Sequence, residues 1–137
     1  MANTHGPQRI IPMLPYADAR AALEFLCRAF GFEETFRLEM PDGGIGHAEV
    51  AYRDNVVMLA DAWTAGGLTS PLELPALHCQ LYCEVDDVDA HCARARAADA
   101  TVVAEPEDQE HGSRTYRALD LEGHRWIFGM PLDGERS

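Results

Sequence analysis

The sequence predicts an α+β fold made of two tandem βαβββ modules. The main observation is that one order of elements occurs twice, in residues 9–61 and again in 77–131. Each copy begins with a short apolar strand and an acidic helix cap, followed by a helix and three strands. A shift of 69 residues superimposes the two copies and places Asp18 on Asp87, with one indel near the end of the helix that pairs Gly31 with Asp99. Each copy is too small to be stable alone, so we expect both to pack as one domain.

In the first module, residues 9–18 are predicted to form a strand that ends at an acidic cap. Residues 19–30 place their apolar side chains on one face of a helix, and Gly31 suits a left-handed helix end. Three strands joined by tight turns follow at 34–40, 45–52 and 56–60.

In the second module, a strand is predicted at 78–85, followed by a helix that Asp86 and Asp87 cap and that runs to about residue 98. Its remaining strands are expected at 101–105, 114–119 and 125–130. Residues 62–76 contain Gly and Pro and are interpreted as a linker, and the tails 1–8 and 132–137 are expected to be flexible.

The charge of the chain excludes some classes of partner. Its eleven basic residues are all arginine, and 23 acidic residues give a formal net charge of −12. Nucleic-acid binding needs clustered basic side chains and is not expected, whereas a cationic ligand is favoured. The N-terminus does not resemble an export signal and no apolar run is long enough to span a membrane, so we expect a cytoplasmic protein with reduced cysteines.

Five short motifs resemble the vicinal oxygen chelate superfamily, which includes glyoxalase I, extradiol dioxygenases and bleomycin-resistance proteins. They span essentially the whole domain and are Ala29-Phe30-Gly31-Phe32-Glu33-Glu34, His47-Ala48-Glu49-Val50, Val85-Asp86-Asp87-Val88-Asp89-Ala90, Glu105-Pro106-Glu107-Asp108-Gln109 and Gly123-His124-Arg125-Trp126. The resemblance implies that each module curls its sheet into half of a cup. It also implies a homodimer, often with exchanged elements.

The resemblance further implies where a metal would bind. In the metalloenzymes of this superfamily, four strand positions carry His or Glu ligands, and these fall on Ile11, Met58, Gln80 and Ile127. None of the four side chains is an imidazole or a carboxylate, the groups that bind divalent ions here. We therefore expect neither the usual metal site nor a cofactor, as in members of the bleomycin-resistance type.

A displaced metal site is left open as an alternative. Strand alternation places His47 and Glu49 on the same face of the first module's sheet. It likewise places His78, Gln80 and Tyr82 on the same face of the second module's sheet. His47, Glu49 and His78 could hold a cation for a glyoxalase-type lyase or a dioxygenase. Otherwise these groups form the polar lining of the cup.

The opposite alternation makes the thiols of Cys79 and Cys83 poor nucleophiles, because it packs them beneath the helix. His91 is expected on a helix surface. Trp63 begins the linker, where it either stacks on a ligand at the rim or packs in a core or dimer interface. The full predicted ligand-binding set is Met13, His47, Glu49, Met58, Trp63, His78, Gln80 and Tyr82.

The function that these observations favour is non-catalytic binding of a bulky, partly aromatic natural product or peptide, and the acidic chain favours a cationic one. Antibiotic sequestration of the bleomycin-resistance type would need stacking surfaces and charge complementarity but no metal. The arginine-only, alanine-rich composition is compatible with a GC-rich bacterial source. Besides the metal-dependent enzyme, a regulatory module with an empty cup is the third hypothesis.

Overall fold

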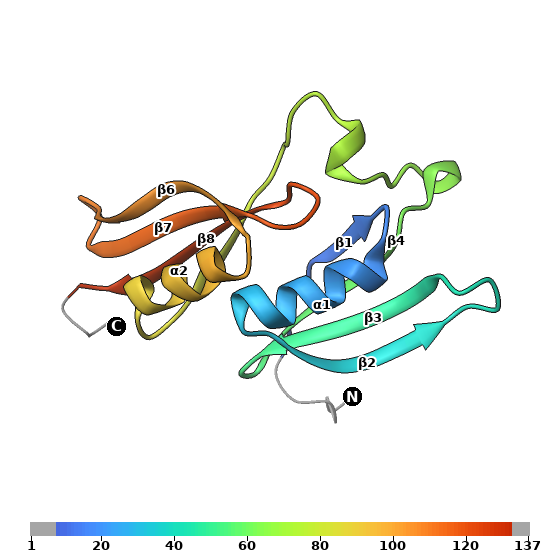
Figure 1. The fold of residues 1–137 in the computed structure, drawn as a ribbon, viewed down its shortest axis with the longest axis horizontal. Coiled ribbons are helices and arrows are strands. Elements are labelled where there is room, and N and C mark those ends of the chain that lie inside the picture. Colours follow the sequence, from blue (N-terminus) through green and yellow to red (C-terminus); the bar gives the residue numbers. More distant parts are fainter. Residues whose placement is uncertain (1–7, 133–137) are drawn as a thin grey trace.

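The computed structural model describes residues 8–132 and contains two four-stranded sheets, each with one helix packed on the same side of the molecule (Figure 1). The first module consists of β1 (Met13–Tyr16), α1 (Ala19–Phe30), β2 (Glu33–Glu39), β3 (Ile45–Tyr52) and β4 (Asn55–Asp61). The second consists of β5 (Leu81–Glu84), α2 (Val88–Ala97), β6 (Thr101–Asp108), β7 (Ser113–Leu119) and β8 (Arg125–Pro131). The predicted α+β fold of two tandem βαβββ modules is confirmed. Of the tails predicted to be flexible, 1–8 and 132–137, residues 1–7 and 133–137 lie outside the described part of the chain.

The two sheets have the same topology, with strand orders β1-β4-β3-β2 and β5-β8-β7-β6. The first strand of each module runs parallel to the last, and the other neighbours are antiparallel. Met13 pairs with Met58 in one sheet and Tyr82 pairs with Ile127 in the other. Both pairs obey the shift of 69 residues that the sequence repeat indicated.

The helix ends also repeat. Asp18 and Asp87 each accept a hydrogen bond from a backbone N–H in the first turn of the helix that follows, at 3.1 and 3.0 Å. At the other end, Gly31 has a φ of 81° and Asp99 a φ of 70°. These left-handed residues stop both helices at the positions that the repeat pairs with each other.

The core lies between each helix and its sheet. Aromatic rings fill much of it: the Phe30 ring of α1 is 4.8 Å from the Phe128 ring of β8, and Trp126 stacks on Phe128 at 6.1 Å with an interplanar angle of 4°. Trp126 is 1% exposed. Such rings bury large apolar areas, which stabilise the fold.

Buried carboxylates join the modules where the β7–β8 turn meets the end of β1. Asp120 accepts a 2.6 Å hydrogen bond from the Tyr16 hydroxyl, and Glu122 accepts from the backbone N–H groups of Ala17 and Asp18 at 2.6 and 2.8 Å. Glu122 also accepts a 2.5 Å hydrogen bond from Ser70. The segment 62–76, predicted as a linker, is therefore anchored to the second module, and it contains two short 3₁₀ turns, Thr64–Gly66 and Pro71–Glu73.

Helix α2 supplies a second connection, to the C-terminus of α1. Arg94 donates to the carbonyl oxygens of Arg28 and Cys27 at 3.0 and 3.1 Å, which places a cation at the negative end of the α1 dipole. His91 is buried and bonded to the carbonyl of Phe30, so the expectation that it lies on a helix surface was wrong. The side of α2 that carries His91 is therefore buried where the two modules pack together.

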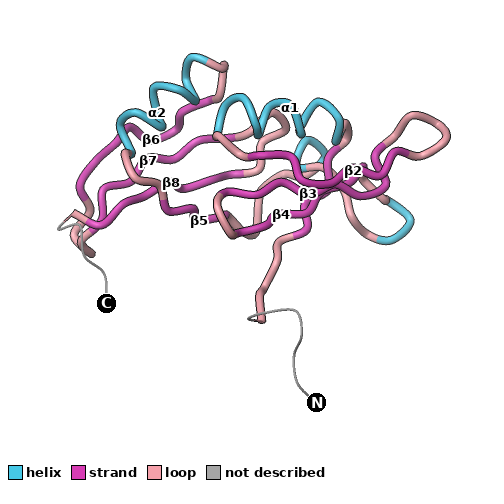
Figure 2. The backbone as a smooth tube through the Cα atoms, turned by 90° about the horizontal axis from the view of Figure 1, so that it is seen from below, coloured by secondary structure: helices cyan, strands magenta, loops and turns pink. Residues whose placement is uncertain are grey.

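Helices α1 and α2 both lie on one side of the molecule, and neither of them covers the opposite side of the two sheets (Figure 2). We call this side the open face. The open faces of the two modules lie side by side within the chain and do not face each other (Figures 1 and 2). No helix within residues 8–132 is long and apolar enough to cross a membrane.

Two strands begin later than the sequence predicts. Ladder pairing of β1 starts at Met13 instead of residue 9, and that of β5 starts at Leu81 instead of residue 78. The reason is that these segments pair with the last strand of each module only from those residues. His78 and Gln80 consequently precede β5, where the alternation of a strand does not determine their direction.

Candidate ligand-binding site

One row of the predicted residues crosses the open face of the first module. Met13 of β1 pairs with Met58 of β4, Met58 with Glu49 of β3, and Glu49 with Phe36 of β2. Side chains that are directly opposite in neighbouring strands point to the same face. The sheet thereby assembles two thioethers, a carboxylate and an aromatic ring from four separate segments.

His47 lies on the same face, two residues before Glu49. Its Nε2 atom lies 2.8 Å from a carboxylate oxygen of Glu49, and its ring lies 5.9 Å from the Phe36 ring. Because a carboxylate accepts, Nε2 is the donor and carries the proton in this pair. The pair is half-buried, so it offers both a polar contact and ring surface to a bound molecule.

A small pocket of about 90 Å³ opens next to this row. Met13 and His47 line it together with Leu68 from the segment between the modules. Leu68 forms a two-residue antiparallel bridge with Trp63, with backbone hydrogen bonds of 2.8 and 3.0 Å. Trp63 is therefore held in the loop that borders the pocket, and the residue is 63% exposed.

Tyr82 is the predicted site residue that lies on the open face of the second module. It pairs with Ile127 of β8, which in turn pairs with Arg117 of β7. Tyr82 is 48% exposed, and its hydroxyl lies over the backbone of Gly129. Arg117 is exposed on this face, so the second module presents a cation where the first presents Glu49.

A larger cleft of about 490 Å³ lies between the modules. Tyr82 is the member of the predicted ligand-binding set that lines it. The lining residues, which come from both modules, are Pro12, Phe32, Tyr52, Arg53, Asn55, Val57, Leu81, Tyr82, Cys83, Glu84 and Trp126. The cleft is large enough for a drug-sized molecule.

Gln80 and His78 are exposed in the segment before β5. Gln80 accepts a 3.0 Å hydrogen bond from Arg125, which fixes its side chain near the start of β8. The structure thus brings Met13, His47, Glu49 and Met58 together. It leaves His78, Gln80 and Tyr82 on the other module.

The donor chemistry at the four metal-ligand positions does not fit a divalent ion. Ile11 and Ile127 have no donor atom, Met58 offers a soft thioether, and the Gln80 oxygen is used by Arg125. Within residues 8–132, no three His, Cys, Asp or Glu side chains are grouped so that they could hold a metal ion. The displaced set His47, Glu49 and His78 is accordingly not assembled within one chain.

Cys79 and Cys83 differ in burial, although strand alternation predicts that both pack beneath the helix. Cys83 packs against the core, and burial raises the pKa of its thiol to about 11. Cys79 is exposed, so its predicted packing beneath the helix was wrong. It lies before β5 begins, where the alternation rule does not apply.

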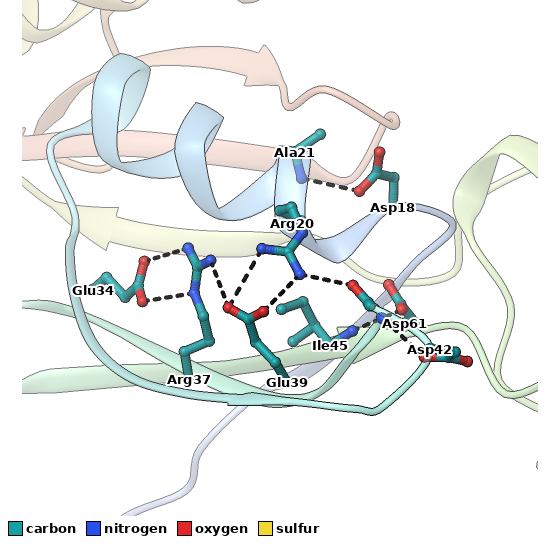
Figure 3. A network of polar contacts seen from close by, with 11 residues as sticks. Asp18, Arg20, Ala21, Glu34, Arg37, Glu39, Asp42, Ile45 and Asp61 are labelled. Atoms are coloured by element: carbon teal, nitrogen blue, oxygen red, sulfur yellow. Dashed lines mark hydrogen bonds and ion pairs between the residues drawn. The ribbon is translucent and has the colours of Figure 1, made fainter.

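Two glutamates of the first module are paired with arginines away from the open face. Arg20 of α1 pairs with Glu39 at 3.1 Å, and Arg37 pairs with Glu34 at 3.0 Å (Figure 3). The same contacts lower the pKa of Glu39, chiefly through its hydrogen bond to Arg20. The net charge of −12 is thus a poor guide to the charge at the open face, where Glu49 and Arg117 have opposite signs.

Two exposed side chains of the open face were missed from the sequence. Phe36 pairs with Glu49, and Leu38 pairs with His47. A signal was present, because Phe36, Leu38 and Met40 alternate with charged residues in the predicted strand 34–40. That strand alternation, followed across the sheet to His47 and Glu49, would have found them.

Comparison with known proteins gives the same family over nearly the whole domain. The model of the Glyoxalase/Bleomycin resistance protein/Dioxygenase superfamily matches residues 10–128. The protein Rv0887c of Mycobacterium tuberculosis is 36% identical over 124 residues, which are 88% of this chain and 73% of the relative. Mb0911c of Mycobacterium bovis is also 36% identical over 124 residues, which are 88% of this chain and 82% of that relative.

Solved structures agree in fold. TioX from Micromonospora sp. ML1 is 32% identical with a TM-score of 0.72, and the match covers 92% of this chain and 100% of TioX. TnmS3 from Streptomyces sp. CB03234, described as an antibiotic binding protein, is 22% identical with a TM-score of 0.71, covering 94% and 99% of the two chains. With its repeated βαβββ modules and this match, the chain belongs to the Glyoxalase/Bleomycin resistance protein/Dioxygenase superfamily.

Proposed function

We propose that this protein binds a partly aromatic natural product of the antibiotic type without transforming it chemically. The observation that carries the proposal is the exposed apolar surface on the open face of the first module, where Met13 is 68% exposed and lies in one row with Met58 and Phe36. Proteins that act as monomers rarely expose contiguous apolar patches without a binding role. Methionine side chains adapt to ligands of irregular shape.

The chemistry of the family positions supports binding over metal-dependent catalysis. The side chains of Ile11, Met58 and Ile127 provide apolar contact where metalloenzymes of the family would provide ligands. The description of the structural neighbour TnmS3 as an antibiotic binding protein supports the same class of ligand. Sequestration lowers the free concentration of a drug and needs affinity only.

The proposal includes a homodimer. The two open faces of one chain lie side by side, so a cup with two walls needs a second copy whose second module covers the first module of its partner. Such a pairing would bring Glu49 of one chain toward the partner's Arg117, and these charges are complementary. Met13 and Phe36 would then line the cup between its two walls, where a ligand can contact them. The proposed place of action is the cytoplasm, where the free cysteines would remain reduced.

Isothermal titration calorimetry against a panel of planar aromatic and peptide antibiotics, cationic and neutral, tests this function. We expect saturable binding with one site per chain and an unchanged ligand in the recovered complex, checked by mass spectrometry. Zinc, nickel or iron at stoichiometric level in protein purified without chelator, together with turnover of the ligand, would contradict the proposal. Light scattering during gel filtration tests the dimer, and a monomer at micromolar concentration would contradict that part.

A further inference from the structure

Two aromatic residues of the predicted ligand-binding set, Trp63 and Tyr82, share a structural feature: each side chain lies directly against a glycine. A Cβ atom at Gly66 would lie 2.2 Å from Cε3 of Trp63 and 2.4 Å from its Cδ2 and Cζ3 atoms. These three atoms belong to the six-membered ring of the indole. The indole can occupy this position because residue 66 has no side chain.

The loop around Trp63 is closed by its backbone. Gly66 N–H donates to the Trp63 carbonyl at 3.0 Å, and the two hydrogen bonds between Trp63 and Leu68 close the loop on the other side. The φ of Gly67 is +85°, which lets the chain turn back toward Leu68. One side of the indole is thus fixed against the loop, and the remaining 63% of the residue surface is open.

Tyr82 shows the same arrangement in the second module. A Cβ atom at Gly129 would lie 2.1 Å from the Tyr82 hydroxyl and 2.7 Å from Cζ, and 3.1 Å from the Cγ2 atom of Thr115. The phenol therefore lies along the open face above β8 instead of standing away from it. Nearly half of its surface is exposed in this position.

An exposed aromatic side chain normally loses rotamer freedom when a ligand stacks on it, and this loss weakens binding. A ring that already rests on the backbone has lost that freedom in the free protein. Its outer surface is then available to a ligand at little entropic cost. Planar aromatic groups benefit most, because stacking is strongest between flat surfaces in contact.

We propose that Gly66 and Gly129 are positioning residues that hold Trp63 and Tyr82 as preformed platforms, so that the ligand of this site presents a planar aromatic ring to Trp63. The inference rests on the proposed function and deepens it by naming the chemical class of the ligand. Trp63 and Tyr82 make the contact, and the glycines act through them. The charge of the ligand is secondary to its planarity at these two positions.

The first test measures the platform without any ligand. Trp126 is 1% exposed, so iodide quenching and the fast phase of fluorescence anisotropy decay report mainly on Trp63. Gly66→Ala should raise the mobility and the quenching of Trp63, because the new methyl group displaces the ring. Gly67→Ala is the matched control: its Cβ meets nothing within 4 Å, while its φ of +85° strains the same loop. Equal mobility in the wild type and Gly66→Ala would overturn the proposal.

The second test measures binding of defined probes by calorimetry. The planar cation 9-aminoacridine and the planar anion anthraquinone-2-sulfonate should both bind the wild type, and the aliphatic cation cyclohexylammonium should not. Gly66→Ala should weaken both planar probes about five- to thirtyfold, and Gly67→Ala should change their affinities less than about twofold. An equal loss in both variants would assign the effect to loop stability and overturn the proposal, as would an unchanged affinity in Gly66→Ala.

A double-mutant cycle tests the second platform. Gly129→Ala and Tyr82→Ala should each weaken the planar probes, and the double variant should bind about as well as Tyr82→Ala alone, because both changes remove the same contact. Additive losses would overturn the role of Gly129. If the wild type binds neither planar probe nor any natural product of the panel, the proposed function itself fails. If the wild type binds and the glycine variants bind equally well, only this inference fails.

Discussion

Tyr16 at the end of β1 and Asp120 in the β7–β8 turn form a 2.6 Å hydrogen bond that joins the two modules across 104 residues of sequence. Asp120 is buried, and desolvation raises the pKa of its carboxyl despite the hydrogen bonds it accepts from Tyr16 and Trp126. The Tyr16 hydroxyl has a raised pKa as well, first because of its burial and then because of Asp120. The connection between the modules is therefore a buried hydrogen bond in which each group influences the pKa of the other.

Tyr16→Phe should lower the free energy of unfolding by about 1–3 kcal/mol, because it leaves a buried carboxylate oxygen with one donor fewer. Urea denaturation followed by circular dichroism measures the change. Tyr82→Phe is the control, since Tyr82 is 48% exposed, and it should alter the free energy by less than about 0.5 kcal/mol. The same midpoint for Tyr16→Phe and the wild type would show that the contact does not stabilise the domain.

His91 should make the protein less stable as the pH falls through about 6.5, the ordinary pKa of histidine. Desolvation lowers the pKa of folded His91, while the unfolded chain binds a proton at the ordinary value. Below that pH the unfolded state holds more protons, so this contribution to stability is present above about pH 6.5 and is lost toward the folded pKa. In the folded protein Nε2 donates to the Phe30 carbonyl at 2.9 Å, and Nδ1 accepts from the Tyr116 hydroxyl at 2.6 Å.

Thermal unfolding at pH 8 and pH 5.5 measures this effect in the wild type and in His91→Gln. The variant should be less stable at pH 8, since it loses a buried hydrogen-bonded group, and its unfolding temperature should depend less on pH. An identical pH dependence in both proteins would assign the acid sensitivity to other groups.

Arg94→Leu should destabilise the domain by about 1–2 kcal/mol, because the guanidinium donates to two carbonyl oxygens at the end of α1 and adds a favourable charge there. Arg96→Leu on the same helix is the comparison. Arg96 pairs with exposed Glu105, and surface ion pairs contribute little. Chemical denaturation of the two variants should therefore rank Arg94 well above Arg96, and the reverse order would refute the role given to Arg94.

The two tryptophans should respond oppositely to substitution. Trp63→Ala should weaken a stacked ligand by about 1–3 kcal/mol and leave the unfolding temperature nearly unchanged, because the side chain is largely exposed. Trp126→Phe should lower the unfolding temperature, because it removes core volume and the 3.1 Å hydrogen bond from Nε1 to Asp120. An unchanged dissociation constant in Trp63→Ala would remove Trp63 from the binding site.

Thiol labelling should distinguish Cys79 from Cys83. With a pKa of about 11, Cys83 has only about one thiolate in a thousand molecules at pH 8 and is in addition largely shielded. Exposed Cys79 should react first with an alkylating reagent, and peptide mass spectrometry identifies the labelled site. Early labelling of Cys83 in the folded protein would contradict its placement against the core.

The fold could be predicted from the sequence because its signals are local and repeated. Helix caps at Asp18 and Asp87 and the left-handed stops at Gly31 and Asp99 depend on neighbouring residues, and each signal occurs twice at the same spacing. The row of Met13, Met58 and Glu49 followed from strand alternation once the strands were known. The exclusion of the usual ligand residues at Ile11, Met58, Gln80 and Ile127 needed only the aligned positions.

Contacts between distant segments could not be predicted in this way. The start of β5 depends on where β8 can pair with it, so the strand predicted at 78–85 was too long and the surroundings of His78 and Cys79 were misjudged. His91 has the polarity of a surface residue, and only the approach of α1 supplies the carbonyl that makes its burial favourable.

The sequence by itself determined the two βαβββ modules, the alternation of side chains within most strands and the lack of ligating side chains at the four family positions. Only the tertiary structure decided how the modules are joined, which charges are neutralised and how the aromatic side chains rest on the backbone. The physical reason is that periodicity and capping are properties of consecutive residues. The contacts of Tyr16 with Asp120 and of Arg94 with the end of α1 instead join segments that no local pattern relates.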